Sequence, residues 1–244
     1  IRGMGAQAKS NVLILINGQK LNNIDMSEID FPSIPINSIY KIEIYKGSAS
    51  SVLYGDGAIG GAINIITLPE KRNSKLNSVE VKTGSFNKRE YIFNSSQNIN
   101  QYSIHSYFNH LETDGYRDEN EQQQNNLTTE IFFPTDKLKN LITISFNEQI
   151  MSTPSDRSQD QLYIDRMGSD TPNDFINSEG VSIQYSTDYS IKESKRFFFN
   201  SSFRQKNSFS DLQTSASYPS YSQTSLKNYQ ITPRINEKNS LFGK

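Results

Sequence analysis

The glycines at positions 55, 57 and 60 have the spacing Gly-x-Gly-x-x-Gly, which in nucleotide-binding proteins surrounds a pyrophosphate with backbone amides. That chemistry needs a strand before the glycines and a helix that opens at the third one, because the helix N-terminus supplies the amides. Here a stretch of small residues precedes the glycines, and a β-branched run at 63–67 follows them. The sequence therefore predicts a strand where a nucleotide site needs a helix.

Catalytic and metal-binding constellations are also missing from the sequence. His105 and His110 are five residues apart, so on a strand they face opposite sides and cannot share a metal ion. Ser50 and Ser51 have no histidine near them in the sequence, and the chain has no cysteine. We therefore expect no enzymatic activity.

The acidic segment 112–121 offers clustered oxygen ligands of the kind that calcium prefers, with Asp114, Asp118 and Glu119 as the candidate ligands. The segment lacks the spacing of an EF-hand, and runs of charge most often form solvated loops. A solvated loop is thus the favoured interpretation and calcium the alternative. No other metal and no organic cofactor is expected.

Composition limits the classes of protein that remain. The 244 residues include 25 basic and 26 acidic side chains, so no charge excess indicates a nucleic-acid partner. Only 34% of the residues are hydrophobic, yet there are 13 tyrosines and 14 phenylalanines. Few aliphatic and many aromatic residues are typical of strands with one polar and one apolar face. No run approaches the roughly 20 apolar residues of a transmembrane helix.

The first 70 residues have the pattern of a small α/β unit. The run at 12–16 predicts a continuous apolar strand, and Asn17-Gly18 after it is a strong tight-turn signal. Residues 39–46 alternate, with Ile42 and Ile44 on one face, and 62–67 form a third predicted strand. A polar linker at 69–74 closes the unit.

From residue 77 onward the sequence alternates between apolar and polar residues over many segments, which is the signal of a sheet. Short turns at 98–100 and 136–139 alternate along the chain with long polar loops at 112–124, 150–176 and 208–224. Short turns at one rim and long loops at the other are the layout of an outer-membrane barrel. A soluble β-sandwich is the alternative, because its half-buried strands alternate too.

Together the two regions resemble a TonB-dependent outer-membrane receptor, a plug domain followed by the start of its barrel. The plug resemblance is carried by Arg2-Gly3 and by residues 12–18, 34–39, 42–47 and 53–67. The loop 114–118 is similar to one that is frequent in iron-chelate receptors of this family. Ser48, Asp56 and Asn17 depart from the usual family residues without changing the resemblance.

The resemblance implies a mainly β fold, in which a small α/β plug domain is followed by an incomplete antiparallel transmembrane β-barrel. We expect the plug at 1–72 and the N-terminal part of the barrel at 77–244, each truncated. Residues 77–244 suffice for about 8 strands of roughly 10 residues, whereas such transporters have about 22. Too few strands to enclose a plug would leave exposed edges in lipid, so the chain is expected to be a fragment.

The resemblance also suggests roles for individual residues. The glycines permit tight turns and close backbone packing rather than phosphate binding; the predicted structural motif comprises Gly47, Tyr54, Gly55, Gly57, Gly60, Gly61 and Asn64. Arg2, Glu43 and Lys46 are candidates for ion pairs between plug and barrel, with ordinary solvated charge as the alternative. In the loop 20–26, the candidate ligand-facing residues are Asn22, Asn23 and Asp25, with a plain polar turn as the alternative.

The function that the resemblance implies is active uptake of a scarce metal chelate, foremost a ferric siderophore, across the bacterial outer membrane. The expected partners are the chelate, outer-membrane lipid and the TonB-ExbB-ExbD complex, whose binding box we expect upstream of Ile1. A cobalamin receptor of the same family is the first alternative, and a soluble β-rich binding module or adhesin the second. Nucleic acid is not an expected partner.

Overall fold

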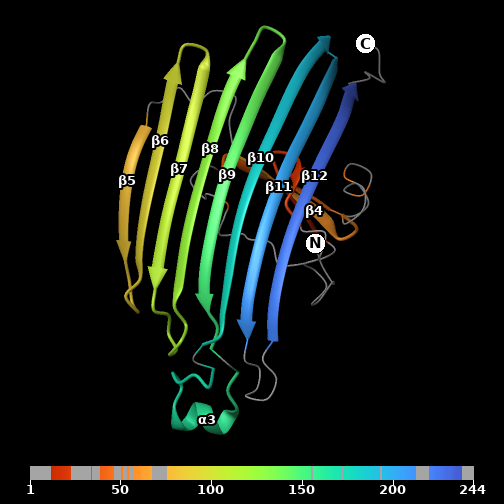
Figure 1. Ribbon diagram of the computed structural model, residues 1–244. Coiled ribbons are helices and arrows are strands. Elements are labelled where there is room, and N and C mark those ends of the chain that lie inside the picture. The colour runs from red at the N-terminus through yellow and green to blue at the C-terminus, as the bar shows by residue number, and fades with distance from the viewer. Residues whose placement is uncertain are drawn as a thin grey trace.

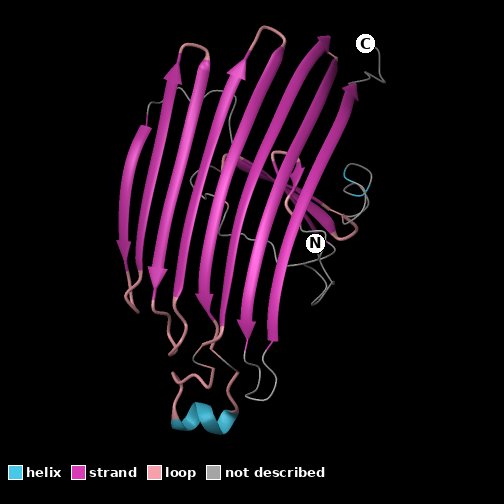
Figure 2. Cartoon of the chain, viewed as in Figure 1, coloured by secondary structure: helices cyan, strands magenta, loops and turns pink. Residues whose placement is uncertain are grey.

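The computed structural model describes residues 12–22, 34, 39–46, 51, 54, 58–67, 76–154, 156–171, 173–192, 194–212 and 220–237. Its strands form two separate sheets, one of four strands and one of eight (Figures 1 and 2). We call the four-stranded sheet the small sheet and the eight-stranded sheet the wall. The predicted mainly β fold, a small unit followed by an antiparallel sheet, is confirmed.

The small sheet has the strand order β2-β1-β4-β3, and its strands are β1 (Val12–Ile16), β2 (Gln19–Lys20), β3 (Lys41–Tyr45) and β4 (Gly61–Ile66). The central pair, β1 and β4, is parallel, whereas β2 and β3 run antiparallel to their neighbours. Asn17 and Gly18 close the β1–β2 hairpin with φ values of 51° and 82°. Two consecutive positive φ angles are what the predicted Asn-Gly turn requires.

The small sheet carries a hydrophobic cluster on each face, because the apolar run of β1 is buried on both sides. Val12 and Ile14 belong to one cluster, and Leu13 and Leu15 belong to the other. The edge strand β3 is different, since Ile42 is 54% exposed while the neighbouring Glu43 is half-buried. The apolar face that alternation predicted for β3 is thus its exposed face.

The wall is a continuous antiparallel sheet in which each strand pairs with the next along the chain. Its strands are β5 (Leu76–Thr83), β6 (Arg89–Ile99), β7 (Tyr102–Thr113), β8 (Gln122–Pro134), β9 (Leu138–Ser152), β10 (Phe175–Lys192), β11 (Lys195–Leu212) and β12 (Ser220–Glu237). The ladders extend the strands into segments that the sequence predicted as long loops, because polar residues there continue the pairing; β10, for example, pairs with β11 up to Phe175 and Asp211.

The two faces of the wall have opposite character. One face is polar and largely buried; its most buried side chains include Ser96, His105, Asn109, Gln124, Asn126, Thr128, Glu130 and Thr143. The other face is apolar and exposed; it carries Phe108, Leu127, Ile144, Phe146, Ile183, Tyr229 and Ile231. This is the arrangement of a membrane barrel wall, with the apolar band outward and the polar side inward.

The connections differ between the two ends of the wall. One end has short turns at 100–101 and 135–137. The other end has longer loops at 114–121 and 153–174, and the second of these contains the helix α3 (Gln159–Ile164) (Figure 1). The predicted alternation of short turns and long loops is confirmed.

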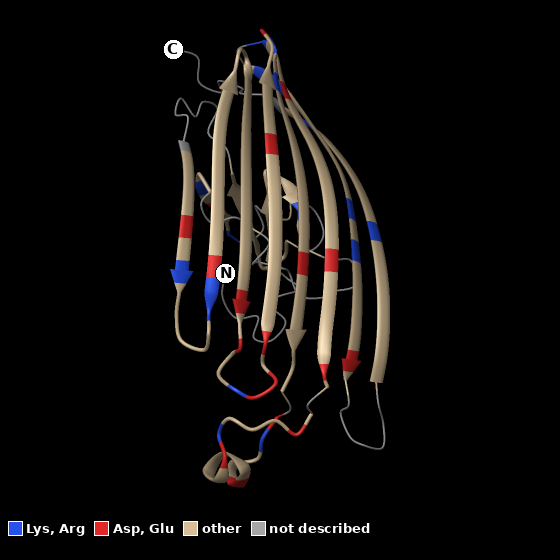
Figure 3. Ribbon diagram, turned by 60° about the vertical axis from the view of Figure 1, so that its left-hand side comes forward, with Lys and Arg blue, Asp and Glu red and all other residues tan. Residues whose placement is uncertain are grey.

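The small sheet lies against the polar face of the wall, behind β10–β12 in the view of Figure 1. Contacts join β2 to β11 across this boundary. Charged residues occupy few positions along each strand, and others lie near the strand ends and in the loops (Figure 3). Among the described helical segments, none has the length and hydrophobicity that crossing a membrane as a helix requires.

Candidate functional site between the small sheet and the wall

A buried hydrogen bond fastens the end of β4 to the wall. The hydroxyl of Thr67, the residue after β4, donates to Oε1 of Glu130 in the middle of β8. Asn17 Nδ2 donates to the same Thr67 hydroxyl at 2.8 Å, and Thr67 N–H donates to Asn17 Oδ1 at 3.1 Å. The β1–β2 turn, the end of β4 and the wall therefore meet in one polar cluster.

A second attachment joins the end of β2 to β11. Arg204 Nη1 donates to the carbonyl oxygen of Leu21 at 2.6 Å, and Nη2 donates to that of Asn22 at 3.3 Å. The planar guanidinium suits this task, because its fork reaches two adjacent carbonyls at once. Asn22 in turn continues the sheet with its side chain: Oδ1 accepts from Ile14 N–H at 2.7 Å, and Nδ2 donates to the Val12 carbonyl at 3.0 Å.

A cavity of about 90 Å³ lies between the small sheet and the wall. Lys20 and Thr67 line it from the small sheet, and Glu130, Arg204 and Lys206 line it from the wall, together with hydroxyl and amide side chains of β8–β12. A space of this size holds several water molecules or one small polar group. The two attachments therefore border a partly open pocket, which Ile16, Leu21 and Ile34 of the small sheet also line.

Gln19 is the least satisfied polar side chain at this boundary. It is 1% exposed, and neither its Oε1 nor its Nε2 has a hydrogen-bond partner among the described residues. The preceding turn is also tight, since a Cβ on Gly18 would approach Asn200 Nδ2 of β11 to 3.3 Å. The β1–β2 hairpin thus sits close against β11 with one unsatisfied amide.

Inside the small sheet, a chain of polar contacts runs toward β3. Asn64 Oδ1 accepts from Gly18 N–H at 2.9 Å, and its Nδ2 donates to Glu43 Oε2 at 3.3 Å. Glu43 also pairs with Lys41 Nζ at 2.7 Å and accepts from the Tyr45 hydroxyl at 2.9 Å. The hydrogen bond from Lys41 lowers the pKa of Glu43 and raises that of Lys41, whereas burial raises the pKa of Tyr45.

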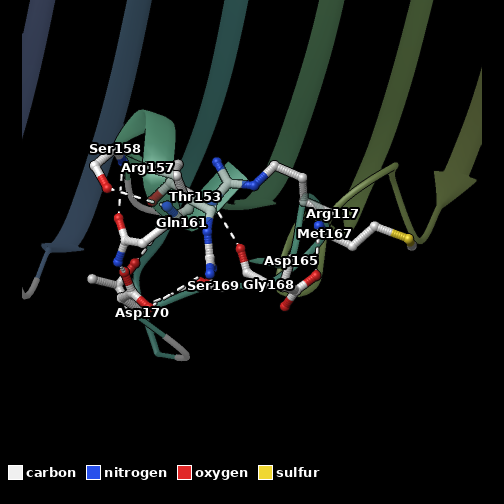
Figure 4. A network of polar contacts seen from close by, with 11 residues as sticks. Arg117, Thr153, Arg157, Ser158, Gln161, Asp165, Met167, Gly168, Ser169 and Asp170 are labelled. Atoms are coloured by element: carbon white, nitrogen blue, oxygen red, sulfur yellow. Dashed lines mark hydrogen bonds and ion pairs between the residues drawn. The ribbon is translucent and has the colours of Figure 1, made fainter. Parts of the chain in front are cut away.

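The long loops at the far end of the wall are joined to each other (Figure 4). Arg117 Nη2 donates to the Gly168 carbonyl at 2.9 Å, and Asp118 N–H donates to the Met167 carbonyl at 2.7 Å. Within the longer loop, Ser158 caps α3 with a full capping box and Gln161 Nε2 reaches Asp170 at 2.8 Å. The bonds Arg117–Gly168 and Asp118–Met167 thus tie the loop 114–121 to the loop 153–174, and we call these two bonds the loop hook.

The predicted calcium ligands lie in this hooked loop. Asp114 Oδ2 accepts from Asn87 Nδ2 at 2.7 Å, and Asp118 contributes its backbone to the hook. Among the described residues, no group of three or more carboxylate or imidazole side chains is arranged to hold a metal ion. Calcium binding through Asp114, Asp118 and Glu119 stays a prediction, testable as calcium-dependent protection of this loop from proteolysis.

Gly60, the last glycine of the Gly-x-Gly-x-x-Gly motif, directly precedes the strand β4. Gly61 opens β4 with a φ of 130°, a conformation that favours glycine, and its N–H donates to the Ala58 carbonyl at 3.1 Å. Ala58 is fully buried, and the ring of Tyr54 stacks edge-on against Tyr45 at 5.5 Å. Gly47, Gly55 and Gly57 lie outside the described residues.

The other predicted site residues are placed as follows. Glu43 pairs with Lys41 of its own strand instead of with the wall, and Lys46 forms no ion pair within the described part of the chain. Arg2, Asn23 and Asp25 lie outside the described residues. The side chain of Asn22 is engaged by β1, so its ligand-facing role stays a prediction.

The residues that do join the two sheets, Thr67, Glu130 and Arg204, were not among the candidates. The available signal was the charge of Glu130, which follows Gln124, Asn126 and Thr128 on one face of β8.

Comparison with known proteins begins with the small sheet. Residues 1–62 match the family described as TonB-dependent Receptor Plug Domain. A vitamin B12 transporter BtuB from Photobacterium profundum is 42% identical over 57 residues, which are 23% of this chain and 9% of that protein. Its namesake from Vibrio vulnificus is 30% identical over 111 residues, 45% of this chain and 18% of that protein.

Solved structures extend the likeness to both sheets. The unliganded ferric citrate transporter FecA superimposes with a TM-score of 0.80 at 15% identity, covering 97% of this chain and 37% of that one. The ferric yersiniabactin uptake receptor FyuA from Yersinia pestis gives 0.75 at 14% identity, covering 96% and 38%. At such identities the likeness concerns the fold, and this chain spans well under half the length of either structure.

Proposed function

Because this chain belongs to the TonB-dependent receptor family, we propose that it forms part of an active uptake receptor for a scarce metal chelate, foremost a ferric siderophore. The members of the family are receptors and transporters. Support for the ferric-chelate assignment comes from the fold shared with FecA and FyuA, whose names refer to ferric citrate and ferric yersiniabactin.

The observation that carries the proposal is the double attachment of the small sheet to the polar face of the wall. Thr67 and Arg204 take part in buried or half-buried hydrogen bonds that hold the two sheets together. A solute moving along this face must displace part of the small sheet, which costs the free energy of those contacts. Such a transporter needs an energy source, and the TonB-ExbB-ExbD complex is the partner we propose for it.

The apolar face of the wall supports a location in the outer membrane. Ile144, Ile183 and Ile231 are each more than two-fifths exposed on the face that points away from the small sheet. Exposed aliphatic side chains in this number are costly in water and favourable against lipid. Homologous TonB-dependent receptors are outer-membrane barrels, and we propose the same location and lipid contact for this protein. A soluble binding module would not present such a face.

A cobalamin receptor is the second candidate. The relatives named vitamin B12 transporter share up to 42% identity with this chain, although the match covers a small part of each. The plug-family match covers residues 1–62, a part that receptors for different ligands have in common. The relatives therefore support cobalamin as the ligand less strongly than their sequence identity of up to 42% suggests.

Uptake by whole cells tests the proposal. The full-length protein is expressed in a strain that lacks its own siderophore and cobalamin receptors, with and without a functional tonB gene. Cells are supplied with radiolabelled ferric chelates or radiolabelled cobalamin. We expect TonB-dependent accumulation of a ferric chelate; accumulation of cobalamin alone selects the second candidate. Equal accumulation without TonB, or none of either substrate, would contradict active chelate uptake.

A further inference from the structure

The outward face of the wall changes from apolar to polar near the long loops. One ladder row that crosses from β6 to β12 is polar, and its members are Tyr91, His110, Asn125, Glu148, Glu179, Asn207 and Ser225. Hydrogen bonds link neighbours in this row, as from Asn125 Nδ2 to Glu148 Oε2 at 3.1 Å. The next row toward the short turns is apolar from β6 to β10, with Phe93, Phe108, Leu127, Phe146 and Val181. The apolar band therefore ends at the polar row.

A partly open pocket of about 310 Å³, which we call the rim pocket, lies beyond the polar row on the side of the long loops. The next ladder row of the same face lines it, and this row consists of Arg89, Glu112, Gln123 and Ile150. Ile150 is the one apolar side chain among the described residues that line the pocket. The volume is at the lower end of the range for small-molecule sites, but such sites are usually lined mostly by apolar residues. The lining therefore suits a ligand that is polar over most of its surface.

The rim pocket offers hydrogen-bond donors and acceptors together with an excess of carboxylates. Glu112, Asp114 and Glu121 line it, whereas Arg89 is the one cation among its described lining residues. Arg89 Nη1 lies 3.3 Å from Glu112 Oε1, so its charge is already balanced. The remaining carboxylates repel a negatively charged ligand. A neutral ligand with many hydroxyl groups fits, because each hydroxyl both donates and accepts.

The β5–β6 turn beside the rim pocket holds an aromatic residue in an unfavourable backbone conformation. Phe86 and Asn87 have φ values of 61° and 52°, a region that bulky residues rarely adopt. The Phe86 carbonyl accepts from Asp114 N–H at 2.9 Å and from the Thr113 hydroxyl at 3.1 Å. The Phe86 ring meets that of Tyr116 edge-on at 5.6 Å, and both residues are nearly half exposed. Strain of this kind is found at functional sites, and here it keeps an exposed aromatic pair next to the pocket.

We propose that the rim pocket binds the saccharide headgroup of a membrane glycolipid. Ring hydroxyls match the mixed donors and acceptors of the lining, and the apolar C–H face of a sugar ring packs on exposed aromatic rings such as Phe86 and Tyr116. The pocket lies on the outward face just beyond the apolar band, which is where the headgroups of surrounding lipids lie. The inference goes beyond uptake, because it concerns the outside of the wall. The choice of a lipid as the source of the saccharide rests on the proposed outer-membrane location.

A double variant of the full-length receptor tests the rim pocket. Glu112→Ala with Gln123→Ala removes two adjacent polar side chains that line it. The receptor is purified in lauryldimethylamine oxide, a detergent without sugar, and titrated with diglucosyl diacylglycerol while native mass spectrometry measures the bound lipid. Phosphatidylethanolamine and phosphatidylglycerol with the same acyl chains are the comparison lipids. We expect the glycolipid to bind at least about tenfold more tightly than either phospholipid, and its affinity to fall about tenfold in the double variant.

Further variants separate binding from folding and from charge. Glu179→Ala with Gln223→Ala removes the same two residue types from the outward face of β10 and β12, outside the rim pocket, and should leave the glycolipid affinity unchanged. Phe86→Asn removes the ring, while asparagine tolerates the positive φ. We therefore expect the turn to stay protected from hydrogen exchange while the glycolipid affinity falls about threefold or more. Because hydroxyls carry no charge, the affinity should change by less than about twofold with salt or with EDTA.

The outcomes distinguish the rim pocket from the transport function. Equal affinity for glycolipid and phospholipids, or unchanged glycolipid affinity in the Glu112/Gln123 double variant, overturns the saccharide site and leaves chelate uptake standing. Loss of binding in EDTA overturns it too, because a bridging cation would then make the contact. If the free diglucose binds as tightly as the glycolipid, the lipid source is wrong. Absence of TonB-dependent uptake contradicts the proposed function and leaves the measured lipid affinities as they are.

Discussion

The hydroxyl of Thr67 donates a hydrogen bond to the carboxylate of Glu130, across 63 residues of sequence. Both side chains belong to residues that are 3% exposed, so the contact between the end of β4 and the middle of β8 is shielded from water. A buried carboxylate is costly unless its oxygens are hydrogen-bonded. The small sheet and the wall therefore stabilise each other at this point.

Replacing Glu130 should loosen the small sheet. Glu130→Ala leaves the Thr67 hydroxyl without this acceptor, so we expect the free energy of opening of β4 to fall by about 1–3 kcal/mol. Glu130→Gln keeps an acceptor oxygen and should cost less. Hydrogen exchange of the β4 amides in the full-length receptor measures the effect. Glu148→Ala, on the outward face of β9, is the control and should leave β4 exchange unchanged.

Replacing Gln19 should have the opposite effect. Its amide is buried with neither polar atom bonded to a described residue, so Gln19→Leu removes a desolvated group while keeping similar volume. We expect the small sheet to become more stable by about 1 kcal/mol, seen as slower exchange of β1 amides. A matched change at an exposed position, Gln101→Leu in the turn between β6 and β7, should alter stability by less than about 0.5 kcal/mol. Destabilisation by Gln19→Leu would show that the amide has a partner in solution.

The loop hook should limit how readily a protease cleaves the loop 153–174. Arg117→Ala removes the bond to the Gly168 carbonyl, while the backbone bond from Asp118 to Met167 remains. Loss of about 1 kcal/mol would raise the open population about fivefold, and limited digestion by a nonspecific protease should speed up accordingly. Arg166→Ala changes an exposed arginine in the same loop and serves as the control. Equal digestion rates for both variants would contradict the hook.

The small sheet should lose stability in acid through Glu43. The hydrogen bond from Lys41 holds the folded-state pKa of Glu43 below its ordinary value of 4.5. The ionised form is therefore favoured by folding: its contribution is fully present above about pH 4.5 and is lost as the pH falls through the folded-state pKa. Because the pair is partly exposed, the contribution is about 1 kcal/mol or less.

Glu43→Gln tests this assignment, since glutamine cannot titrate. Hydrogen exchange of β3 and β4, measured between about pH 3 and 6 and corrected for the intrinsic exchange rate, should depend on pH less in the variant than in the unsubstituted protein. Glu179→Gln, on the outward face of the wall, should leave that dependence unchanged. If Glu43→Gln preserves the full acid dependence, another carboxylate is responsible.

Local patterns were sufficient to predict the elements. Asn17-Gly18 predicted a hairpin because few dipeptides tolerate two positive φ angles. The apolar run at 12–16 predicted a strand, and the structure buries that strand on both faces. Period-two alternation separated the wall strands into two faces, which correctly placed His105 and His110 on opposite sides. The extent of the wall strands was underestimated, because polar residues such as Asn177 and Ser208 pair in the ladder as well as apolar ones do.

The sequence by itself determined the class of the molecule: a small sheet with a glycine-rich turn, then strands with one polar and one apolar face. It did so because turns and alternation depend on neighbours a few residues apart. Only the tertiary structure decided which residues join the two sheets, since Arg204 meets Leu21 across 183 residues and Glu130 meets Thr67 across 63. Contacts at such separations are set by how one sheet lies on another, and a local pattern carries no information about that placement.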